Sequence, residues 1–242
     1  MSQEENAEIP HEDEEPPRRE PVFNIAPAVV AIAGACIAIH LVSAHLLSTS
    51  AYVWLIENFA FIPIRYSGAY PFTLAWVVSP LSYSLLHGGY AHLIINMIWL
   101  AAFGSPLANR IGTRRFFLFW AATALGAVAL HNALHSGEAV PLVGASGAIS
   151  GMMGAAARFA FRIDRKRDKP AFAGEVLAIP RVLSSRPAVT FLAVWFAINF
   201  ATGLGFDASG MSAQIAWEAH IGGFFVGFFA IRLFDRPSLA YL

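Results

Sequence analysis

The sequence has little charge for its length. Of its 242 residues, 13% are charged and 57% are hydrophobic, whereas soluble domains carry about 25% charged residues. The formal net charge is zero, so no overall field favours nucleic acid or an acidic substrate. We therefore expect lipid to surround much of the chain, and we expect no nucleic-acid partner.

Cysteine is also scarce, because Cys36 is the only one and lies in an apolar run. A single thiol excludes an intramolecular disulfide and a cysteine-based zinc or iron–sulfur site.

Large apolar side chains are rare in residues 1–24, which are acidic and contain several prolines. Such a segment buries too little surface to fold, and a signal peptide would begin with basic residues. We expect 1–24 to be a disordered cytoplasmic tail that is not cleaved.

What the chain does have is long apolar segments. About 20 helical residues cross a hydrocarbon core, and six segments come near that length: 25–47, 88–109, 115–135, 146–161, 188–204 and 214–234. The fourth reaches only about 24 Å at 1.5 Å per residue, so one of its ends should stop inside the membrane. The pattern predicts an all-α polytopic membrane protein with six transmembrane helices.

The basic residues predict the orientation of these helices. With six crossings, every Lys and Arg except Arg65 falls on one side, in the tails, in connections or near segment ends. Because cytoplasmic loops are rich in Lys and Arg, both termini should be cytoplasmic. The long first outer connection, 48–87, is rich in Tyr, Trp and Phe, which favour the headgroup level. It should lie in the outer interface, although part of 72–86 could instead begin the second helix.

Ser146 lies in a run of small residues, from Gly144 to Gly147, where the fourth segment begins. Its flanking glycines would let a substrate backbone approach the hydroxyl. The Ser146 and Gly147 amides would lie in the first helical turn, where amides lack intrahelical partners and can donate to a developing oxyanion. A row of small residues used for helix packing is the competing interpretation, and Ser150 is a second candidate serine.

His220 lies near the outer end of the sixth segment and is suited to accept a proton near neutral pH. Gly223 and Gly227 follow it at a spacing that allows close helix contact. This small-residue row would bring His220 to Ser146. The competing interpretation is a histidine that only donates to a backbone carbonyl.

His92 and Asn96 share a face of the second segment, because residues four apart in a helix are neighbours. An imidazole and an amide on one face suit an oxyanion hole, although they could simply bond to each other or to a neighbouring helix. All three clusters lie toward the outer leaflet. Glu218 should point away from His220, so we predict a Ser146–His220 dyad without a third carboxylate.

Taken together, the spacing His92-x-x-x-Asn96, Gly144-Ala-Ser146-Gly147 and Ala219-His220-Ile-Gly-Gly223 resembles the rhomboid family of intramembrane serine proteases, in particular its bacterial members. The resemblance implies a six-helix rhomboid-like bundle over 25–236, followed by a short cytoplasmic end at 237–242. It implies that Ser146 is the nucleophile, that His220 is the base, and that His92, Asn96 and the Gly147 region stabilise the oxyanion.

The resemblance also implies single-pass transmembrane substrates, the inner membrane as location, an active site toward the extracytoplasmic side, and no cofactor. The sequence departs from the family pattern at Ser150, where many bacterial members place a tyrosine that packs on the base, and it lacks the family's Trp-Arg pair in the first loop.

Two alternatives remain. A catalytically inactive rhomboid-like protein would bind membrane helices without cutting them, but inactive members lose the serine or the histidine. A metal transporter would use histidines such as His131 and His135, which have the i, i+4 spacing of metal ligands. No H-E-x-x-H motif and no paired carboxylates support it, so we expect no metal.

Overall fold

The computed structural model describes residues 25–166, 169–204 and 216–235. The predicted tail at 1–24, the C-terminal end at 237–242 and the predicted outer loop from residue 205 to 213 lie outside these ranges. The described part is mainly helical, as expected. It also contains a two-stranded antiparallel hairpin, which the sequence analysis did not predict.

The first half of the described chain forms eight consecutive elements, namely α1 (Pro27–His45), α2 (Thr49–Phe59), the 3-10 turn η1 (Pro63–Ser67), α3 (Leu74–Ser82), the 3-10 turn η2 (Tyr83–Leu85), α4 (Tyr90–Trp99), the π-helical turn η3 (Leu100–Gly104) and α5 (Ser105–Ile111). The second half forms α6 (Thr113–His135), α7 (Ser146–Arg158), β1 (Ile163–Asp164), β2 (Ala171–Phe172), α8 (Ile179–Leu183), α9 (Arg186–Gly203) and α10 (Trp217–Phe234).

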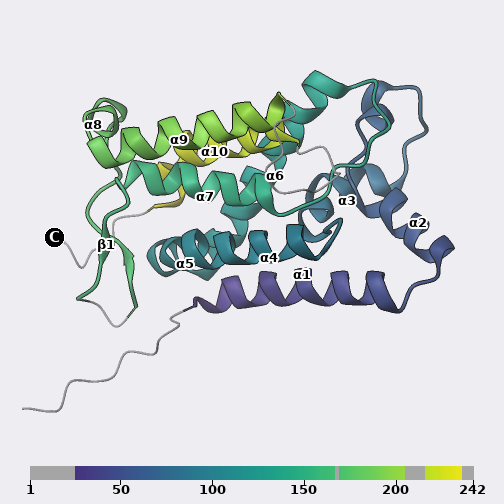
Figure 1. The fold of residues 1–242 in the computed structure, drawn as a ribbon, viewed down its shortest axis with the longest axis horizontal. Coiled ribbons are helices and arrows are strands. Elements are labelled where there is room, and N and C mark those ends of the chain that lie inside the picture. The colour runs from purple at the N-terminus through teal and green to yellow at the C-terminus, as the bar shows by residue number, and fades with distance from the viewer. Residues whose placement is uncertain (1–24, 167–168, 205–215, 236–242) are drawn as a thin grey trace, which may run out of the picture.

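Several helices run side by side along the longest axis of the molecule, including α1, α4, α7, α9 and α10 (Figure 1). α10 packs against both α6 and α7, and α6 also packs against α7. α7 is buried on nearly all sides, from Gly147 to Arg158. Because its residues are mainly Gly and Ala, its neighbours can approach its backbone closely. α7 is therefore the central helix of the bundle.

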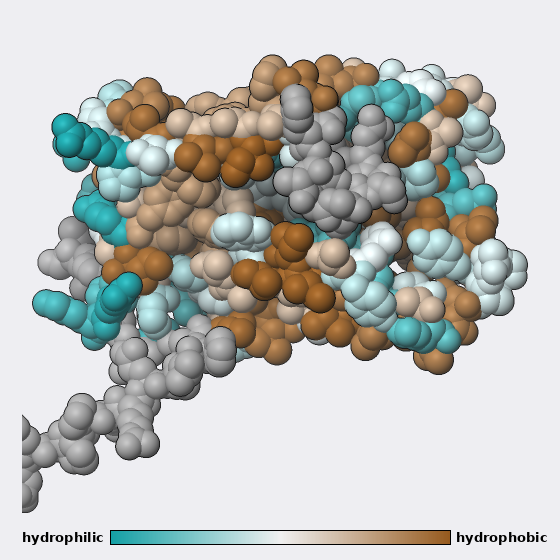
Figure 2. All heavy atoms as spheres, viewed as in Figure 1, coloured by the Kyte–Doolittle hydropathy of each residue, from teal (hydrophilic) through white to brown (hydrophobic). Residues whose placement is uncertain are grey.

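Three helical stretches are long and apolar enough to cross a membrane, namely α1, the continuous stretch Tyr90–Ile111 and α6. They coincide with three of the six predicted segments, so a mainly helical fold with three candidate membrane spans is confirmed, while the number six stays a prediction. α7 has 13 residues and is shorter than a full crossing, as expected. In Figure 2, hydrophilic residues gather toward the two ends of the long axis, and much of the surface between them is hydrophobic.

Basic residues gather at the end of the bundle where α5 stops and α6 begins. Arg110 forms a two-pronged ion pair with Asp235, with contacts of 2.8 and 3.0 Å, and donates to the Phe172 carbonyl at 3.0 Å. Buried Arg158 donates to the Leu177 and Phe228 carbonyls. These bonds fasten the hairpin region to the ends of α5, α7 and α10.

The opposite end is built from the two connections 48–87 and 136–145. The first connection folds into α2, η1, α3 and η2 rather than extending the second apolar segment toward residue 72. Phe61 pairs with Leu142 as an isolated bridge, and the Ile64 amide donates to the Glu138 carbonyl at 2.9 Å. Each connection therefore holds the other in place, and together they surround the beginning of α7.

Candidate active site

Ser146 is the first residue of α7 and follows a tight backbone turn at Gly144. Gly144 has φ = +126°, a left-handed value that favours glycine. A Cβ on Gly144 would lie 2.7 Å from His92 Cε1 and 3.6 Å from Ser146 Oγ. The absent side chain at Gly144 thus lets the His92 ring and the Ser146 hydroxyl approach the same point.

Glycines also join α7 to α10. A Cβ on Gly223 would overlap the carbonyl oxygen of Gly147, and a Cβ on Gly227 would overlap that of Gly151. Because both pairs have the same offset in sequence, the two helices run parallel with their backbones in contact. A Cβ on Gly147 would lie 3.6 Å from the carbonyl oxygen of Ala219. The turn that carries Ser146 therefore adjoins the turn that carries His220, while the hydrogen bond between the two side chains stays a prediction.

His220 has a partner that the sequence analysis missed. Its Nδ1 lies 2.8 Å from Asn199 Oδ1, and the Asn199 amide nitrogen donates to the Trp195 carbonyl at 2.8 Å. Because the Asn199 nitrogen already donates to Trp195, the atom that faces His220 is the amide oxygen. An amide oxygen can only accept a hydrogen bond, so His220 Nδ1 carries the proton and Nε2 has the free lone pair. A buried amide inside the apolar stretch of α9 was the available signal, since such groups in lipid usually have a function.

Ser146 and His220 are both half-buried residues. Within residues 25–166, 169–204 and 216–235, no hydrogen bond joins Ser146 Oγ to the His220 ring. Such bonds are often long in the absence of substrate and shorten when it binds. The backbone contact between their turns therefore defines the site more firmly than a side-chain distance does.

His92 and Asn96 lie on one face of α4, as expected. Asn96 is buried, and its amide nitrogen donates to the His92 carbonyl at 3.0 Å. The His92 ring lies edge-on to that of His87 at 5.1 Å between centroids. His92 therefore reaches the Ser146 turn through Gly144, whereas Asn96 bonds within its own helix.

Gly147 contributes its backbone rather than a side chain. The Ile149 amide donates to the Ala145 carbonyl at 3.0 Å, in the first hydrogen-bonded turn of α7. The Ser146 and Gly147 amides precede that bond and have no acceptor within the helix. They can donate to a charge that develops beside the serine.

Glu218 faces away from His220, as predicted. Its carboxylate contacts His131 and His135 on α6 instead. Ser150, one turn after Ser146, is buried at 5% exposure. No carboxylate is thus placed against His220 within the described residues, and Asn199 is the group that contacts its Nδ1.

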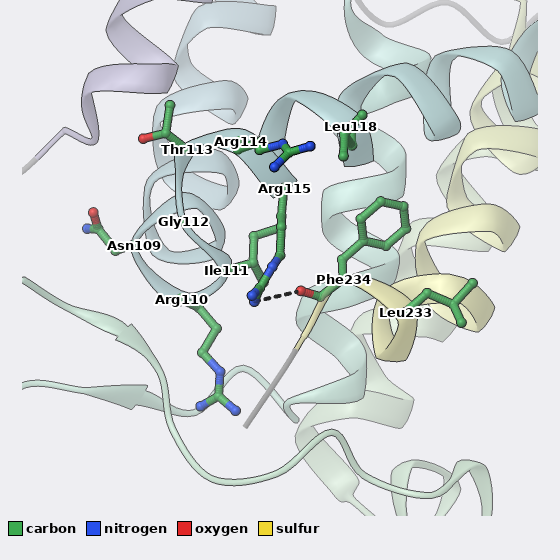
Figure 3. A pocket seen from close by; sticks show the side chains of 10 residues that line it. All are labelled: Asn109, Arg110, Ile111, Gly112, Thr113, Arg114, Arg115, Leu118, Leu233 and Phe234. Carbon is green, nitrogen blue, oxygen red and sulfur yellow. Dashed lines mark hydrogen bonds between the residues drawn. The ribbon is translucent and has the colours of Figure 1, made fainter. Parts of the chain in front are cut away.

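Two described cavities lie outside this serine–histidine pair. One, of about 740 Å³, is lined by residues around the α5–α6 turn and the end of α10, as Figure 3 shows. Its Phe234 is about 21 Å along the α10 axis from His220. The other, of about 420 Å³, is lined by residues that include His40, His87 and Tyr90. It lies on the α1 side of α4, near His92.

The fold and the site together define a class of protein: a helical bundle with candidate membrane spans that carries a serine and a histidine on two touching helices. The rhomboid domain model matches residues 75–236, which include Asn96, Ser146 and His220. The match covers more than half of the chain, so the protein belongs to the rhomboid family. It is similar to RHOMBOID-like protein 5 of Arabidopsis thaliana, with 29% identity over 160 residues. The aligned region is 65% of this chain and 44% of that relative, so this chain spans less than half of the relative's length.

Proposed function

We propose that the protein is a serine endopeptidase that cleaves transmembrane segments of other proteins within the membrane. The observation that carries the proposal is the parallel contact between α7 and α10, in which Gly147 and Gly223 bring the Ser146 and His220 turns together. Family membership supports the same reading. The hydrogen bond from His220 to Asn199 supports it too, because it leaves Nε2 free to accept a proton.

The reaction would proceed through an acyl-enzyme. Ser146 Oγ attacks the scissile carbonyl carbon while His220 Nε2 takes the hydroxyl proton. His220 then gives that proton to the leaving amine as the peptide C–N bond breaks. Water, deprotonated by His220, hydrolyses the ester and restores the serine. The Ser146 and Gly147 amides, with His92 and Asn96, would stabilise the oxyanion. Asn199 would hold the imidazole.

Substrates would be single-pass transmembrane helices that enter from the lipid. A helix hides its carbonyl groups in internal hydrogen bonds, so it must unwind locally before Ser146 can attack. The connections around the beginning of α7 would admit the unwound stretch and the water that hydrolysis needs. This chemistry needs no cofactor and no metal.

The proposed domain is a six-helix bundle over 25–236, with cytoplasmic segments at 1–24 and 237–242. The basic end of the bundle would face the cytoplasm, and Ser146 would face the extracytoplasmic side of a cell (inner) membrane. The connection 48–87 would lie in the outer interface, because it exposes aromatic side chains such as Trp54 and Phe72.

A panel of model transmembrane substrates tests the proposal, with purified protein in lipid nanodiscs. Wild type should cleave at least one substrate, and Ser146→Ala and His220→Ala should fall to background. Ser150→Ala is the matched control, since this serine lies one turn further along α7, and it should keep activity. A fluorophosphonate probe should label wild type and Ser150→Ala but not Ser146→Ala.

An inactive rhomboid-like protein that only binds membrane helices predicts a different result. It would retain substrate in a pull-down, cleave none of the panel and leave Ser146 unlabelled. Cleavage that survives in Ser146→Ala would contradict the nucleophile assignment. The retention of both Ser146 and His220 in one chain favours the protease.

A further inference from the structure

A second cluster of reactive groups lies where α6 ends and α10 begins. His131 and His135 on α6 and Glu218 on α10 each offer a ligand atom, and these atoms lie within 4.8 Å of one another. His131 Nδ1 is 3.4 Å from Glu218 Oε1, and His135 Nε2 contacts the same oxygen. None of these side chains has a part in the proposed hydrolysis.

Burial of these polar side chains costs free energy unless a further group binds them. Glu218 is 4% exposed, and its second oxygen, Oε2, is buried without a hydrogen-bond partner among the described residues. His131 Nδ1 is buried and likewise accepts or donates no hydrogen bond in the described chain. A carboxylate oxygen removed from water without a partner is strongly unfavourable, so Glu218 Oε2 calls for a partner that can bind its lone pairs.

The proton positions lead to the same conclusion. His135 Nδ1 lies 2.8 Å from the exposed carboxylate of Glu138, so it donates a proton there. In neutral His135 this leaves an Nε2 lone pair directed at an oxygen of Glu218. Two facing lone pairs repel unless a proton or a cation lies between them. A histidine that donates one nitrogen to a carboxylate and offers the other is also the usual arrangement of a metal-binding histidine.

The donor set fits a zinc ion. Two imidazoles and one carboxylate are a ligand set for Zn²⁺ with one position left for water. Ligands about 2.1 Å from a tetrahedral ion lie about 3.4 Å from each other, which is the separation of His131 Nδ1 and Glu218 Oε1. His135 Nε2 lies closer to that oxygen, so its ring would have to move outward to admit the ion. The sequence predicted no metal, because no carboxylate could be placed beside His131 and His135. Glu218 reaches them only through the packing of α10 on α6.

We propose that His131, His135 and Glu218 form a Zn²⁺ site that joins α6 to the first turn of α10. Glu218 lies two residues before His220, so the ion would anchor the helical turn that presents the proposed base. The ion would stabilise the bundle without taking part in peptide hydrolysis. The proposal is thus independent of the protease activity.

Metal binding can be measured on full-length, untagged protein in nanodiscs after chelation. Wild type and Ser146→Ala should each bind one equivalent of Zn²⁺ by calorimetry and elemental analysis, and Zn²⁺ should raise the unfolding temperature. His131→Ala and Glu218→Gln should lose the equivalent and the thermal shift. Glu138→Gln should weaken binding about 10- to 100-fold, because it supports a ligand rather than being one.

His45→Ala is the matched control, because this exposed histidine lies at the end of α1 outside the cluster. It should bind Zn²⁺ like wild type. If Glu218→Gln does not fold, His135→Ala gives the same test from α6. The proposal is wrong if wild type binds no Zn²⁺ above the level of His131→Ala. In that case a proton shared between His135 and Glu218 holds the two helices together.

Discussion

At the scale of single residues, the candidate site depends on which nitrogen of His220 carries a proton. Asn199 fixes that choice, because its own amide nitrogen is already bonded to the Trp195 carbonyl. An amide oxygen holds the imidazole but carries no charge to stabilise the imidazolium, unlike a buried aspartate in a Ser-His-Asp triad. Asn199 should therefore orient the base rather than raise its basicity strongly.

Replacement of Asn199 tests this positioning role. In Asn199→Ala, the His220 ring loses its acceptor and can rotate or change tautomer. A neutral hydrogen bond contributes about 0.5–1.5 kcal/mol, so kcat should fall about two- to twelvefold with little change in KM. The measurement is steady-state cleavage of a model substrate in nanodiscs.

Asn199→Asp is the conservative variant for this test, because it keeps an oxygen at the same place. It should retain most of the activity that Asn199→Ala loses. Equal losses in both variants, together with a lower unfolding temperature, would mean that Asn199 only supports the packing of α9. Unchanged kcat in Asn199→Ala would show that the bond to His220 has no role in the reaction.

At the scale of elements, the α7–α10 contact requires glycine. The Gly223 and Gly227 positions face carbonyl oxygens of α7 so closely that a methyl group overlaps backbone atoms. Backbone cannot move aside as a flexible side chain can, so a larger residue must push the helices apart. The same displacement would separate the Ser146 turn from the His220 turn, so stability and activity should decline together.

Gly227→Ala should destabilise the protein by about 1–3 kcal/mol, the usual cost of overpacking a closely packed core. The unfolding transition in a mixed detergent titration measures the change. Gly34→Ala is the control, because a Cβ there meets no atom within 4 Å on α1. Alanine is also the better helix former, so Gly34→Ala should be neutral or slightly stabilising. If Gly227→Ala behaves like Gly34→Ala, the close helix contact is wrong.

The elements also explain what the sequence could predict. Apolar length gave the positions of α1, α6 and the stretch Tyr90–Ile111, because the requirement to span lipid is written locally in composition. Small-residue spacing predicted the contact of α7 with α10, because a row of small residues marks where two helices can approach closely. The Asn199–His220 and Glu218–His131 contacts also join different helices, but no spacing pattern says which polar side chains will meet. They depend on how each helix is rotated in the bundle.

At the scale of the whole molecule, the two ends of the bundle differ in chemistry. Arginines and the ion pair of Arg110 with Asp235 gather at one end, and the proposed catalytic turns lie at the other. The positive-inside rule then gives one orientation. The element that decides the number of crossings is α7, because its 13 residues extend only about 20 Å, less than the hydrocarbon core of about 30 Å. Six crossings require that the chain around α7 completes the passage.

Single-cysteine labelling tests that arrangement. The native thiol, Cys36, is fully buried, and Cys36→Ala removes it from the background. Three exposed positions then bracket α6 and α7, namely Thr113, Gly137 and Glu175. Under six crossings, Gly137→Cys should react with an impermeant maleimide in intact spheroplasts, whereas Thr113→Cys and Glu175→Cys should react only after permeabilisation. If residue 137 is outside and residue 175 is inside, the polypeptide near α7 must cross the bilayer even though the helix is short. Labelling of Glu175→Cys in intact spheroplasts would mean that α7 enters and returns on the outer side, leaving the basic hairpin region outside and contradicting both the six-crossing bundle and its orientation.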